Sequence, residues 1–366
     1  MERSSNIAGC VSSIQTGMKP RSYAEAGVDV AEIKRRHKDL AKIFSATFRF
    51  RRGKVGSVYY GIGHYAGLID LKDGRLLATH IDGVGTKVIV AQLLRRYDTV
   101  GIDCVAMNVN DIICVGAEPI AFLDYLALKK PDQSLIQQVA EGVAKGAALA
   151  GVAVVGGETA VLPDLLAGGE ETFDLAGAAI GVVEKGRVVT GEKMKAGDVV
   201  IGVGSSGIHS NGLTLARKLL LTKYRLDEVV EPLERTLGEE LLEPTLIYVK
   251  PVLEILKKDI YVSGLAHITG GAFSKLSRLT KGLNLGFELD DLPDPQPIFK
   301  LIQKEGNLPD EEMYRTFNMG VGYCVITSPE YVDDVERILK RHGFKAKPIG
   351  RVVKGRGVRV KGVKIA

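Results

Sequence analysis

Residues of several chemically useful types lie together in the octapeptide His-Ile-Asp-Gly-Val-Gly-Thr-Lys, residues 80–87. A carboxylate such as that of Asp82 can hold a hard cation such as Mg²⁺. An ammonium such as that of Lys87 offers a point charge to phosphate. The glycines between them leave backbone N–H groups free to approach an anion. The candidates from this stretch are Asp82, Gly83, Gly85, Thr86 and Lys87.

Two interpretations of this stretch are open. An apolar strand over 76–81 leads into it, so it is either an anion-binding loop or a plain strand-to-helix turn with an exposed lysine. Its spacing excludes the Walker loop, which has four residues between its first glycine and its Gly-Lys pair. It also excludes the dinucleotide fingerprint, because Val88 stands where that motif has Gly or Ala. Residues 61–67 imitate the fingerprint but lead into another strand, so they form a mobile flap or a plain loop.

A second group of polar residues lies in the segment 99–116, which reads as a helix ending at a glycine. The helix is apolar nearly all round and should therefore be buried. Asp103 and Asn110 share one face, and Asp111 lies one position further round. Buried carboxylates need a cation or a full set of hydrogen bonds. The pattern indicates either a metal or nucleotide site beside Asp82 or a structural polar network.

A further carboxylate, Glu158, follows a predicted strand over 152–155. We expect it on a glycine turn at the strand end, where open α/β sheets place ligands. The candidates in this turn are Gly156, Gly157, Glu158 and Thr159.

A third glycine-rich loop lies between a strand over 198–203 and a helix over 213–221. Small residues and hydroxyls ahead of a helix N-terminus favour an anion site. His209 in the middle of the loop is a catalytic residue, a binding residue or a loop residue only. The other candidates are Gly204, Ser205, Ser206, Gly207, Ser210 and Asn211.

The remaining pattern predicts two α/β domains, which is also the expectation from a length of 366 residues. The segment 184–197 is polar, contains glycines and lacks an apolar period, so the boundary is placed there. Other expected elements are a charged helix over 30–46, strands over 55–60, 121–128, 174–183, 282–289 and 323–327, helices over 133–150 and 329–342, and a basic hairpin over 349–365.

Composition narrows the function classes. Hydrophobic residues make up 45% and charged residues 25%, as is usual for a globular protein, and the formal net charge is +5. No nucleic-acid-binding motif accompanies this charge, and no apolar run approaches the ~20 residues of a membrane span. The four cysteines lack metal or redox spacing, which predicts a reduced, cytoplasmic protein. Residues 1–20 are polar and patternless and read as disordered, with Met18 as the expected true start.

Taken together and in this order, the motifs resemble the phosphoribosylformylglycinamidine cyclo-ligase (AIR synthetase) family of the AIR synthetase-like ATP-binding superfamily. The resemblance covers essentially everything after residue 21. The matching stretches are SYAEAGVD at 22–29, DGVGTK at 82–87, TVGIDCVAMNVNDIICVGAEP at 99–119, GGETA at 156–160, GSSGIHSNG at 204–212, HITGG at 267–271 and MYRTFNMGVG at 313–322.

This resemblance implies a two-domain α/β (α+β) fold. An N-terminal ATP-binding and dimerisation domain, 21–187, would have a mixed sheet that forms a barrel-like interface in a homodimer. A C-terminal α/β layered domain, 188–366, would complete a cleft between the domains. The implied reaction uses ATP to close the imidazole ring of formylglycinamidine ribonucleotide, giving aminoimidazole ribonucleotide, ADP and phosphate. Mg²⁺ is required in the family and K⁺ is often used.

The resemblance also implies residue roles. Because an amide oxygen is a poor leaving group, it must be phosphorylated before nitrogen displaces it. The implied catalytic residues are Asp82, Lys87, Asp111 and His209, and the implied metal ligands are Asp82, Asp111 and Glu158. ATP would contact Gly83, Gly85, Thr86, Asn108, Asn110, Gly156, Gly157 and Thr159. The ribonucleotide would contact Gly204, Ser205, Ser206, Gly207, Ser210 and Asn211, with the 5′-phosphate at the first four.

A few positions depart from the family pattern. Ala272 stands where a third glycine is usual, and Ile208 stands where proline is usual. The flap over 61–67 is short. A lysine of the first helix is functional in relatives, and both Lys38 and Lys42 remain open for that role.

Relatives in the same superfamily, among them the preceding amidotransferase of the pathway, are the competing assignments, together with a non-enzymatic scaffold. Selenophosphate enzymes carry a reactive Cys followed by Lys, whereas Val11 follows Cys10 here. The related hydrogenase maturation factor ends in a reactive Cys, whereas this chain ends in Lys-Ile-Ala. A thiamine-monophosphate kinase should lack the His209 loop in this form. A scaffold would have no reason to keep Asp82, Asp111, Glu158 and Lys87 together, and absence of nucleotide binding would reveal it.

Overall fold

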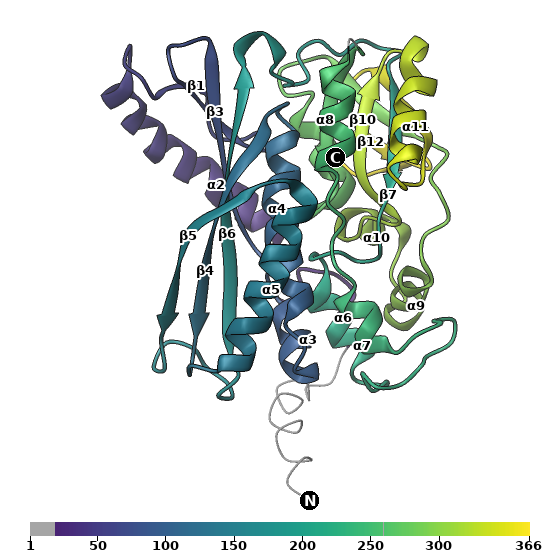
Figure 1. Ribbon diagram of the computed structural model, residues 1–366. Coiled ribbons are helices and arrows are strands. Elements are labelled where there is room, and N and C mark those ends of the chain that lie inside the picture. Colours follow the sequence, from purple (N-terminus) through teal and green to yellow (C-terminus); the bar gives the residue numbers. More distant parts are fainter. Residues whose placement is uncertain (1–18, 259) are drawn as a thin grey trace, which may run out of the picture.

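The computed structural model describes residues 19–258 and 260–366. Figure 1 shows two halves side by side, each built on one sheet, with helices between and outside the sheets. All strands of the first sheet precede residue 185, and all strands of the second follow residue 198. The division into domains 21–187 and 188–366 stays a prediction. The proposed start at Met18 lies outside the described residues.

The first sheet has six strands in the order β1-β2-β3-β6-β4-β5. Only the β4–β5 pair is parallel, so the sheet is mixed, as expected. The loop over 61–67 joins β1 to β2. The strands are β1 (Ser57–Tyr60), β2 (Gly67–Asp70), β3 (Arg75–Gly83), β4 (Glu118–Leu128), β5 (Ala153–Val161) and β6 (Phe173–Glu184).

Helices α4 (Asp98–Ile113) and α5 (Gln133–Ala150) cover one face of this sheet. Every residue of α4 after the first is buried, as its apolar pattern predicted. The Asp132 side chain accepts a hydrogen bond from the first turn of α5, and Gly151 ends the helix in the left-handed conformation. A Cβ at Gly142 would lie 1.9 Å from the Asp98 carbonyl oxygen, so glycine is needed for the close contact of the two helices.

The second sheet has seven strands in the order β13-β12-β9-β11-β7-β10-β8. Only the β12–β9 pair is parallel. Its strands are β7 (Val199–Gly204), β8 (Val262–His267), β9 (Leu285–Leu289), β10 (Val321–Thr327), β11 (Ala346–Lys354), β12 (Gly357–Val360) and β13 (Val363–Lys364). The shorter helices of this half are α6 (Leu213–Leu220), α7 (Leu237–Leu242), α8 (Val249–Lys257), α9 (Pro297–Gly306), α10 (Asp310–Thr316) and α11 (Val332–Arg341).

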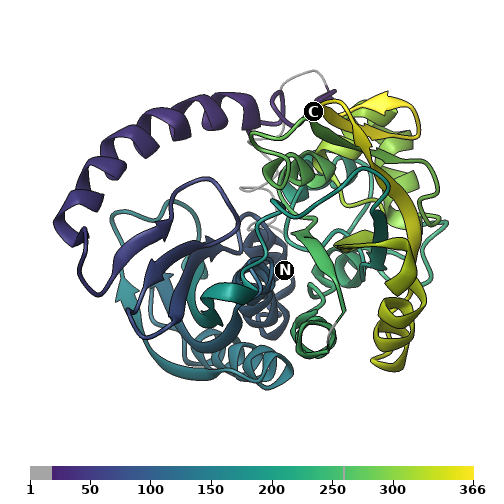
Figure 2. The same ribbon diagram turned by 90° about the horizontal axis from the view of Figure 1, so that it is seen from above.

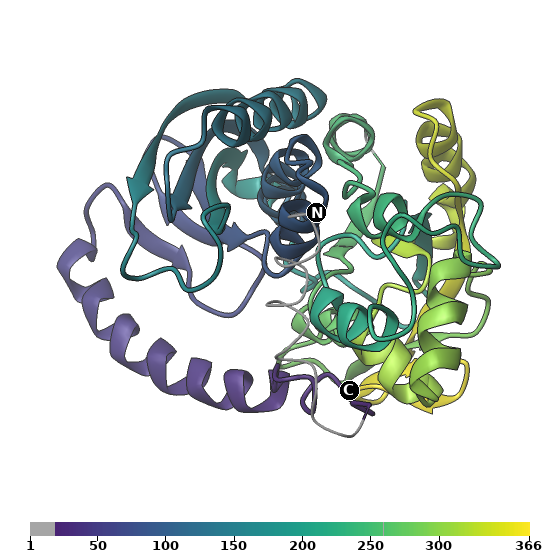
Figure 3. The same cartoon turned by 90° about the horizontal axis from the view of Figure 1, so that it is seen from below.

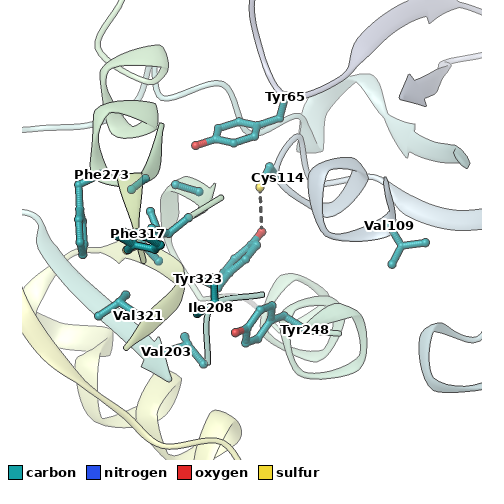
Figure 4. Packing of buried hydrophobic residues seen from close by; sticks show 14 of the residues in the cluster. Tyr65, Val109, Cys114, Val203, Ile208, Tyr248, Phe273, Phe317, Val321 and Tyr323 are labelled. Carbon is teal, nitrogen blue, oxygen red and sulfur yellow. Dashed lines mark hydrogen bonds between the residues drawn. The ribbon is translucent and has the colours of Figure 1, made fainter. Parts of the chain in front are cut away.

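The two halves share one core. Helix α8 packs against α4 and α5, so these helices lie between the two sheets. Figure 4 shows Tyr65 of the first half above Cys114 and Tyr323, all of them buried. The Cys114 thiol donates a hydrogen bond of 3.3 Å to the Tyr323 hydroxyl. Burial on both sides of the junction holds the halves in a fixed relation.

Helix α2 (Val30–Ser45) lies apart from this core. Figures 2 and 3 show it arching from the C-terminal half to the outer edge of the first sheet. Asp29 accepts a hydrogen bond from the backbone of Glu32 and begins the helix. Lys38 and Lys42 are both exposed on it, so the choice between them stays open.

Two sequence-based predictions about strands were wrong. The strand over 152–155 does not end at a glycine turn, because β5 continues through residue 161 by pairing with β4. Residues 349–365 do not form one hairpin, because β9 lies between β11 and β12. In both places the partner strand, which is distant in sequence, decides the outcome.

No helix among the described residues is long and apolar enough to cross a membrane.

Candidate active site

The candidate site lies where β3 faces α4 at the junction of the halves. Side chains alternate along a strand, so His80 and Asp82 share the face of β3 that packs on α4, together with buried Leu76 and Ala78. The last turns of α4 bring Asn108 and Asp111 to the same place. From the second half, His267 arrives at the end of β8.

Asp111 is surrounded by cationic or protonatable groups. Its Oδ1 lies 2.8 Å from Nδ1 of His267, and its Oδ2 lies 3.3 Å from Nε2 of His80 and 4.0 Å from the Lys275 ammonium. Burial alone would raise the pKa of this carboxyl, but the three neighbours outweigh burial and hold its pKa well below the usual range. Both oxygens are therefore engaged by the protein, which does not fit the expectation of a metal ligand.

Asp82 differs from Asp111 in having an oxygen to spare. Its Oδ1 accepts a hydrogen bond of 2.8 Å from the Gly83 backbone, whereas its Oδ2 has no partner within the described ranges. Burial raises the pKa of Asp82, and the negative charge of Asp111 adds to this, against Lys275 and His80. Asp82 is thus the carboxylate of the pair that can meet a ligand.

Asn108 ties the two sides of this site together. Its Nδ2 donates to the carbonyl oxygens of Asp82 (3.2 Å) and Cys104 (2.9 Å). Its Oδ1 lies 3.1 Å from Nδ1 of His80. Asn108 therefore orients His80 and the backbone at Asp82, and the contact with ATP that the family resemblance implies for it stays a prediction.

Glu158 does not join these carboxylates within one subunit. Across the sheet, Asp82 of β3 pairs with Gly177 of β6, which pairs with Asp124 of β4. Glu158 of β5 pairs instead with Tyr125, the residue after Asp124, and so belongs to the adjacent row of paired residues. Adjacent rows point to opposite faces of a sheet. Glu158 and the neighbouring Gly156, Gly157 and Thr159 are exposed on the edge strand. The three carboxylates therefore do not come together within one subunit, and the described part of the chain holds no group of three or more His, Cys, Asp or Glu placed to bind a metal. Their role as metal ligands stays a prediction.

Lys87 also lies elsewhere than expected. It begins α3 (Lys87–Leu94), and its side chain is completely buried. Its ammonium lies 2.8 Å from Oδ2 of Asp103 and donates to the carbonyl oxygen of Glu243 at 2.5 Å. Neither an exposed lysine nor a phosphate ligand fits this position. The structural polar network considered for Asp103 is what the structure contains. Thr86 contacts the second half directly, with 2.8 Å between its hydroxyl and that of Thr214.

The partner of Lys87 belongs to a segment, Glu243–Tyr248, that α4 holds along its length. Asp103 Oδ1 accepts hydrogen bonds from the backbone N–H and the hydroxyl of Thr245, at 2.8 and 2.5 Å. Asn110 donates to the Leu246 carbonyl (2.8 Å) and accepts from the Tyr248 N–H (2.9 Å). Asn110 is thus occupied by the protein rather than positioned as a contact for ATP.

The same segment then holds the glycine-rich loop of the second half. The Tyr248 hydroxyl donates to the Gly204 carbonyl at 2.9 Å, and the Ser206 hydroxyl donates to the Pro244 carbonyl at 2.6 Å. The Ser205 hydroxyl donates to Asn318 at 2.9 Å. The two serine hydroxyls are therefore used to shape the loop and do not fit the expected contact with the substrate phosphate.

His209 is buried beneath this loop in the left-handed conformation, with φ at 63°. Its Nε2 accepts a hydrogen bond of 3.3 Å from the Ser206 backbone, which leaves the proton of the neutral ring on Nδ1. Burial lowers its pKa well below the usual range, helped by His267 and Lys87. Burial is the largest cause, and it favours the neutral ring.

Polar atoms without partners gather beside His209. Asn211 lies close to the loop that follows β8, since a Cβ at Gly270 would come within 2.7 Å of its Oδ1. Native proteins rarely leave buried polar atoms unpaired, so these atoms point to a ligand. Within the described ranges, the buried atoms here that lack a hydrogen-bond partner are His209 Nδ1, Ser210 Oγ, Asn211 Nδ2 and Thr269 Oγ1.

Sequence reasoning missed several residues of this site. His80 and His267 lay inside quoted motifs, but nothing in their spacing indicated that both would face Asp111. Thr245 and Tyr248 lie in a segment without a recognisable motif, and only their contacts reveal them. Lys275 carries no signal beyond its place after the His-Ile-Thr-Gly-Gly motif.

The chain also matches known proteins along most of its length. Residues 63–183 match the family described as AIR synthase related protein, N-terminal domain, and residues 195–363 match the corresponding C-terminal domain. Among solved structures, thiamine-monophosphate kinase from Stenotrophomonas maltophilia is 20% identical with a TM-score of 0.62, covering 87% of this chain and 95% of that one. T. maritima PurL complexed with ATP is 18% identical with a TM-score of 0.55, covering 86% and 45%. These likenesses show the fold alone.

Closer relatives share half of their residues with this chain. The phosphoribosylformylglycinamidine cyclo-ligase of Thermococcus gammatolerans is 52% identical over 346 residues, which are 94% of this chain and 99% of the relative. The enzyme of the same name from Methanocaldococcus jannaschii is 48% identical over 336 residues, covering 91% of this chain and 92% of the relative. Identity of this extent, across both matched domains, shows that the chain belongs to the phosphoribosylformylglycinamidine cyclo-ligase family.

Proposed function

We infer that the chain closes the imidazole ring of formylglycinamidine ribonucleotide, forming 5-aminoimidazole ribonucleotide, ADP and phosphate from the ribonucleotide and ATP. The observation that carries this function is the near full-length identity to enzymes named for that activity. The geometry supports it, because Asp82 has a carboxylate oxygen without a partner and the loop around His209 holds a group of donors without partners, both within the described ranges.

The chemistry runs in two steps. The formamide oxygen of the substrate attacks the γ-phosphorus of ATP, and the bond to the β,γ-bridging oxygen breaks to release ADP. The amidine nitrogen that bears the ribose then attacks the activated formyl carbon and loses a proton, and phosphate leaves with the former amide oxygen. The protein contributes mainly positioning and charge neutralisation, as in other phosphoryl transfers.

The unpaired donors near His209 are proposed to bind the ribonucleotide phosphate. The Ser210 and Thr269 hydroxyls, the Asn211 amide and Nδ1–H of neutral His209 are all hydrogen-bond donors, which suits an anion rich in acceptor oxygens. His209 would then bind and orient the substrate. Proton transfer during ring closure is the other role left open by the sequence.

Mg²⁺ is proposed to enter with the substrate, as the complex of Mg²⁺ and ATP. Asp82 is the residue proposed to face this complex, because its Oδ2 is free of partners within the described ranges. T. maritima PurL has been solved with ATP, and separately with FGAR, which supports small-molecule phosphate ligands for this fold. Use of K⁺ stays a prediction, to be tested by assay with and without potassium.

An isotope experiment tests both the reaction and its path. Substrate carrying ¹⁸O in the formamide is expected to transfer that label to inorganic phosphate, because the phosphorylated oxygen leaves with the phosphoryl group. Mass spectrometry of phosphate and of the nucleotide product measures it. No aminoimidazole ribonucleotide at all would reject the function. Label retained in the nucleotide or found in water would reject only the phosphorylated intermediate.

A homodimer is proposed from the open face of the first sheet. That face exposes Ile81 (74%) and Tyr125 (42%), and the edge strand β5 exposes Val155 (60%). Contiguous exposed apolar residues on a sheet commonly mark an interface. Two copies joined at this face would remove the apolar surface from water. A barrel-like arrangement of the two sheets stays a prediction.

The oligomeric state tests this proposal. Light scattering is expected to give twice the chain mass for the wild type and one chain mass for Val155→Lys, since a lysine would be buried at the interface. Val229→Lys is the matched control, because Val229 is equally exposed (59%) on the second half and should leave the dimer intact. A monomeric wild type, or a dimeric Val155→Lys variant, contradicts the interface.

A cytoplasmic location remains proposed, on the ground that Cys104, Cys114 and Cys324 are buried free thiols, as is usual in reducing compartments.

A further inference from the structure

Lys275 carries a positive charge from the second half of the molecule into the carboxylate site. It lies in the 3₁₀ helix η5 (Ala272–Arg278), and 11% of its side chain is exposed. Its ammonium lies 4.0 Å from Oδ2 of Asp111 and interacts electrostatically with Asp82. It makes no hydrogen bond to any residue within the described ranges.

Such an ammonium is incompletely satisfied. It has three N–H donors, and buried charges are normally both paired and hydrogen-bonded. Burial lowers the pKa of Lys275, and the positive charge of Arg278 does the same, whereas Asp111 and Asp82 act to raise it. Asp111 and Asp82 compensate the positive charge of Lys275, but neither accepts a hydrogen bond from its N–H groups within the described ranges. The group therefore lacks acceptor oxygens.

The surrounding residues hold Lys275 in this position. Its ammonium lies 5.8 Å from the centre of the Tyr65 ring, and the Tyr65 hydroxyl donates to the Lys275 carbonyl at 3.3 Å. Arg278 lies 5.1 Å from the same ring and donates to the His64 carbonyl at 3.3 Å. Through Tyr65 and His64, the loop between β1 and β2 of the first half contacts η5 of the second half. These contacts fix the position of Lys275 before a ligand binds.

The turn into η5 also has a structural cause. Gly271 and Ala272 both take positive φ, at 84° and 41°. Positive φ is uncommon for alanine, and Ala272 stands where the family pattern has a third glycine. The positive φ values at these two residues turn the backbone, so that η5 begins directly after the loop that follows His267.

We propose that Lys275 is a catalytic residue whose ammonium contacts the phosphoryl group transferred from ATP. The transferred phosphoryl group carries negative charge on its equatorial oxygens, and these oxygens are the acceptors that the ammonium lacks. The ammonium lies 4.0 Å from Asp111, and its charge also interacts with Asp82, the carboxylate that has a free oxygen. The assignment rests on the proposed function, because it needs ATP as the phosphoryl donor.

Nucleotide binding without the ribonucleotide is the first test. Calorimetry compares a non-hydrolysable ATP analogue with ADP, each with Mg²⁺. The wild type is expected to bind the analogue more tightly than ADP. In Lys275→Met the ratio of the two Kd values is expected to fall about tenfold, while the Kd for ADP stays within about threefold of the wild-type value. Lys281→Met is the matched control, since it deletes an exposed lysine just after η5 and should bind both nucleotides as wild type does.

Turnover is the second test. Lys275→Met is expected to lower kcat by about 10²–10³-fold, comparable to the loss of one donor to a developing oxyanion. Lys275→Arg should recover part of the loss, because it restores the charge with a different shape. Lys275→Gln, which keeps polarity without charge, tests the same point if the Met variant melts early.

The outcomes separate this proposal from the proposed function. An unchanged analogue preference, or wild-type turnover in Lys275→Met, would show that Lys275 only neutralises Asp111. A wild type with no preference for the analogue would also overturn the assignment. If the wild type makes no aminoimidazole ribonucleotide but its analogue preference depends on Lys275, the reaction is misassigned and the phosphoryl contact stands.

Discussion

Replacing Asp82 by Asn is expected to lower kcat at least about 10²–10³-fold without loss of stability. The free oxygen of Asp82 is the one proposed to face the complex of Mg²⁺ and ATP, so an amide there forfeits a charge at the reacting phosphates. Stability should be unchanged or slightly higher near neutral pH. Burial and Asp111 raise the pKa of Asp82, which means that its ionised form is disfavoured in the fold.

Steady-state kinetics measures the expected fall in kcat, and thermal melting measures the expected stability. Asp73→Asn serves as the control, because Asp73 is an exposed carboxylate in the turn that precedes β3. Its ion pair with Arg75 lies at the surface, where such pairs contribute little. A folded Asp82→Asn enzyme with near-normal kcat would refute the role of Asp82.

The second large effect concerns stability rather than catalysis. Lys87→Met is expected to destabilise the fold by roughly 3–5 kcal/mol, because it leaves Asp103 buried without its counter-ion. Burial lowers the pKa of Lys87 and Asp103 acts against that, as expected for a pair buried together. Without Lys87, the Glu243 carbonyl would lose its hydrogen-bond donor. The segment 243–248, which holds the glycine-rich loop, would then be held less firmly.

A double-mutant cycle identifies the cause. Lys87→Met combined with Asp103→Asn removes both charges and keeps an oxygen for Thr245, so it should recover most of the lost stability. The exposed pair Lys130–Glu170 is the control, and Lys130→Met should cost no more than about 1 kcal/mol in urea unfolding. If Lys87→Met melts like wild type but loses ATP binding, Lys87 binds phosphate as the family resemblance implies, and the stabilising role of its ion pair with Asp103 is wrong.

The sequence by itself determined the elements that are governed by local pattern. Helix α4 is apolar nearly all round, so its burial followed from the local pattern alone. Asp132 and Gly151 carry the ordinary start and stop signals of a helix, so α5 has the predicted bounds. The ordered motifs were also sufficient to predict the family, since they depend on residue type and spacing.

Strand pairing was decided by the tertiary structure. Gly156 and Gly157 have the local character of a turn, but β4 supplies partners on both sides of a register shift before Gly156 and keeps the chain extended. The stretch over 349–365 has the local character of a hairpin, but β9 inserts between its strands. Backbone hydrogen bonds to distant strands outweigh a weak local preference, and a sequence pattern does not reveal those partners.

The tertiary structure also decided where each charged side chain points. Lys87 and Lys275 are both lysines near a glycine motif, yet the first is fully paired inside the fold and the second reaches the carboxylates with its donors unused. The difference depends on Asp103 and Glu243 in one case and on Tyr65 and Asp111 in the other. A buried charge takes its role from the groups that compensate it, and these groups come together only when the two halves pack.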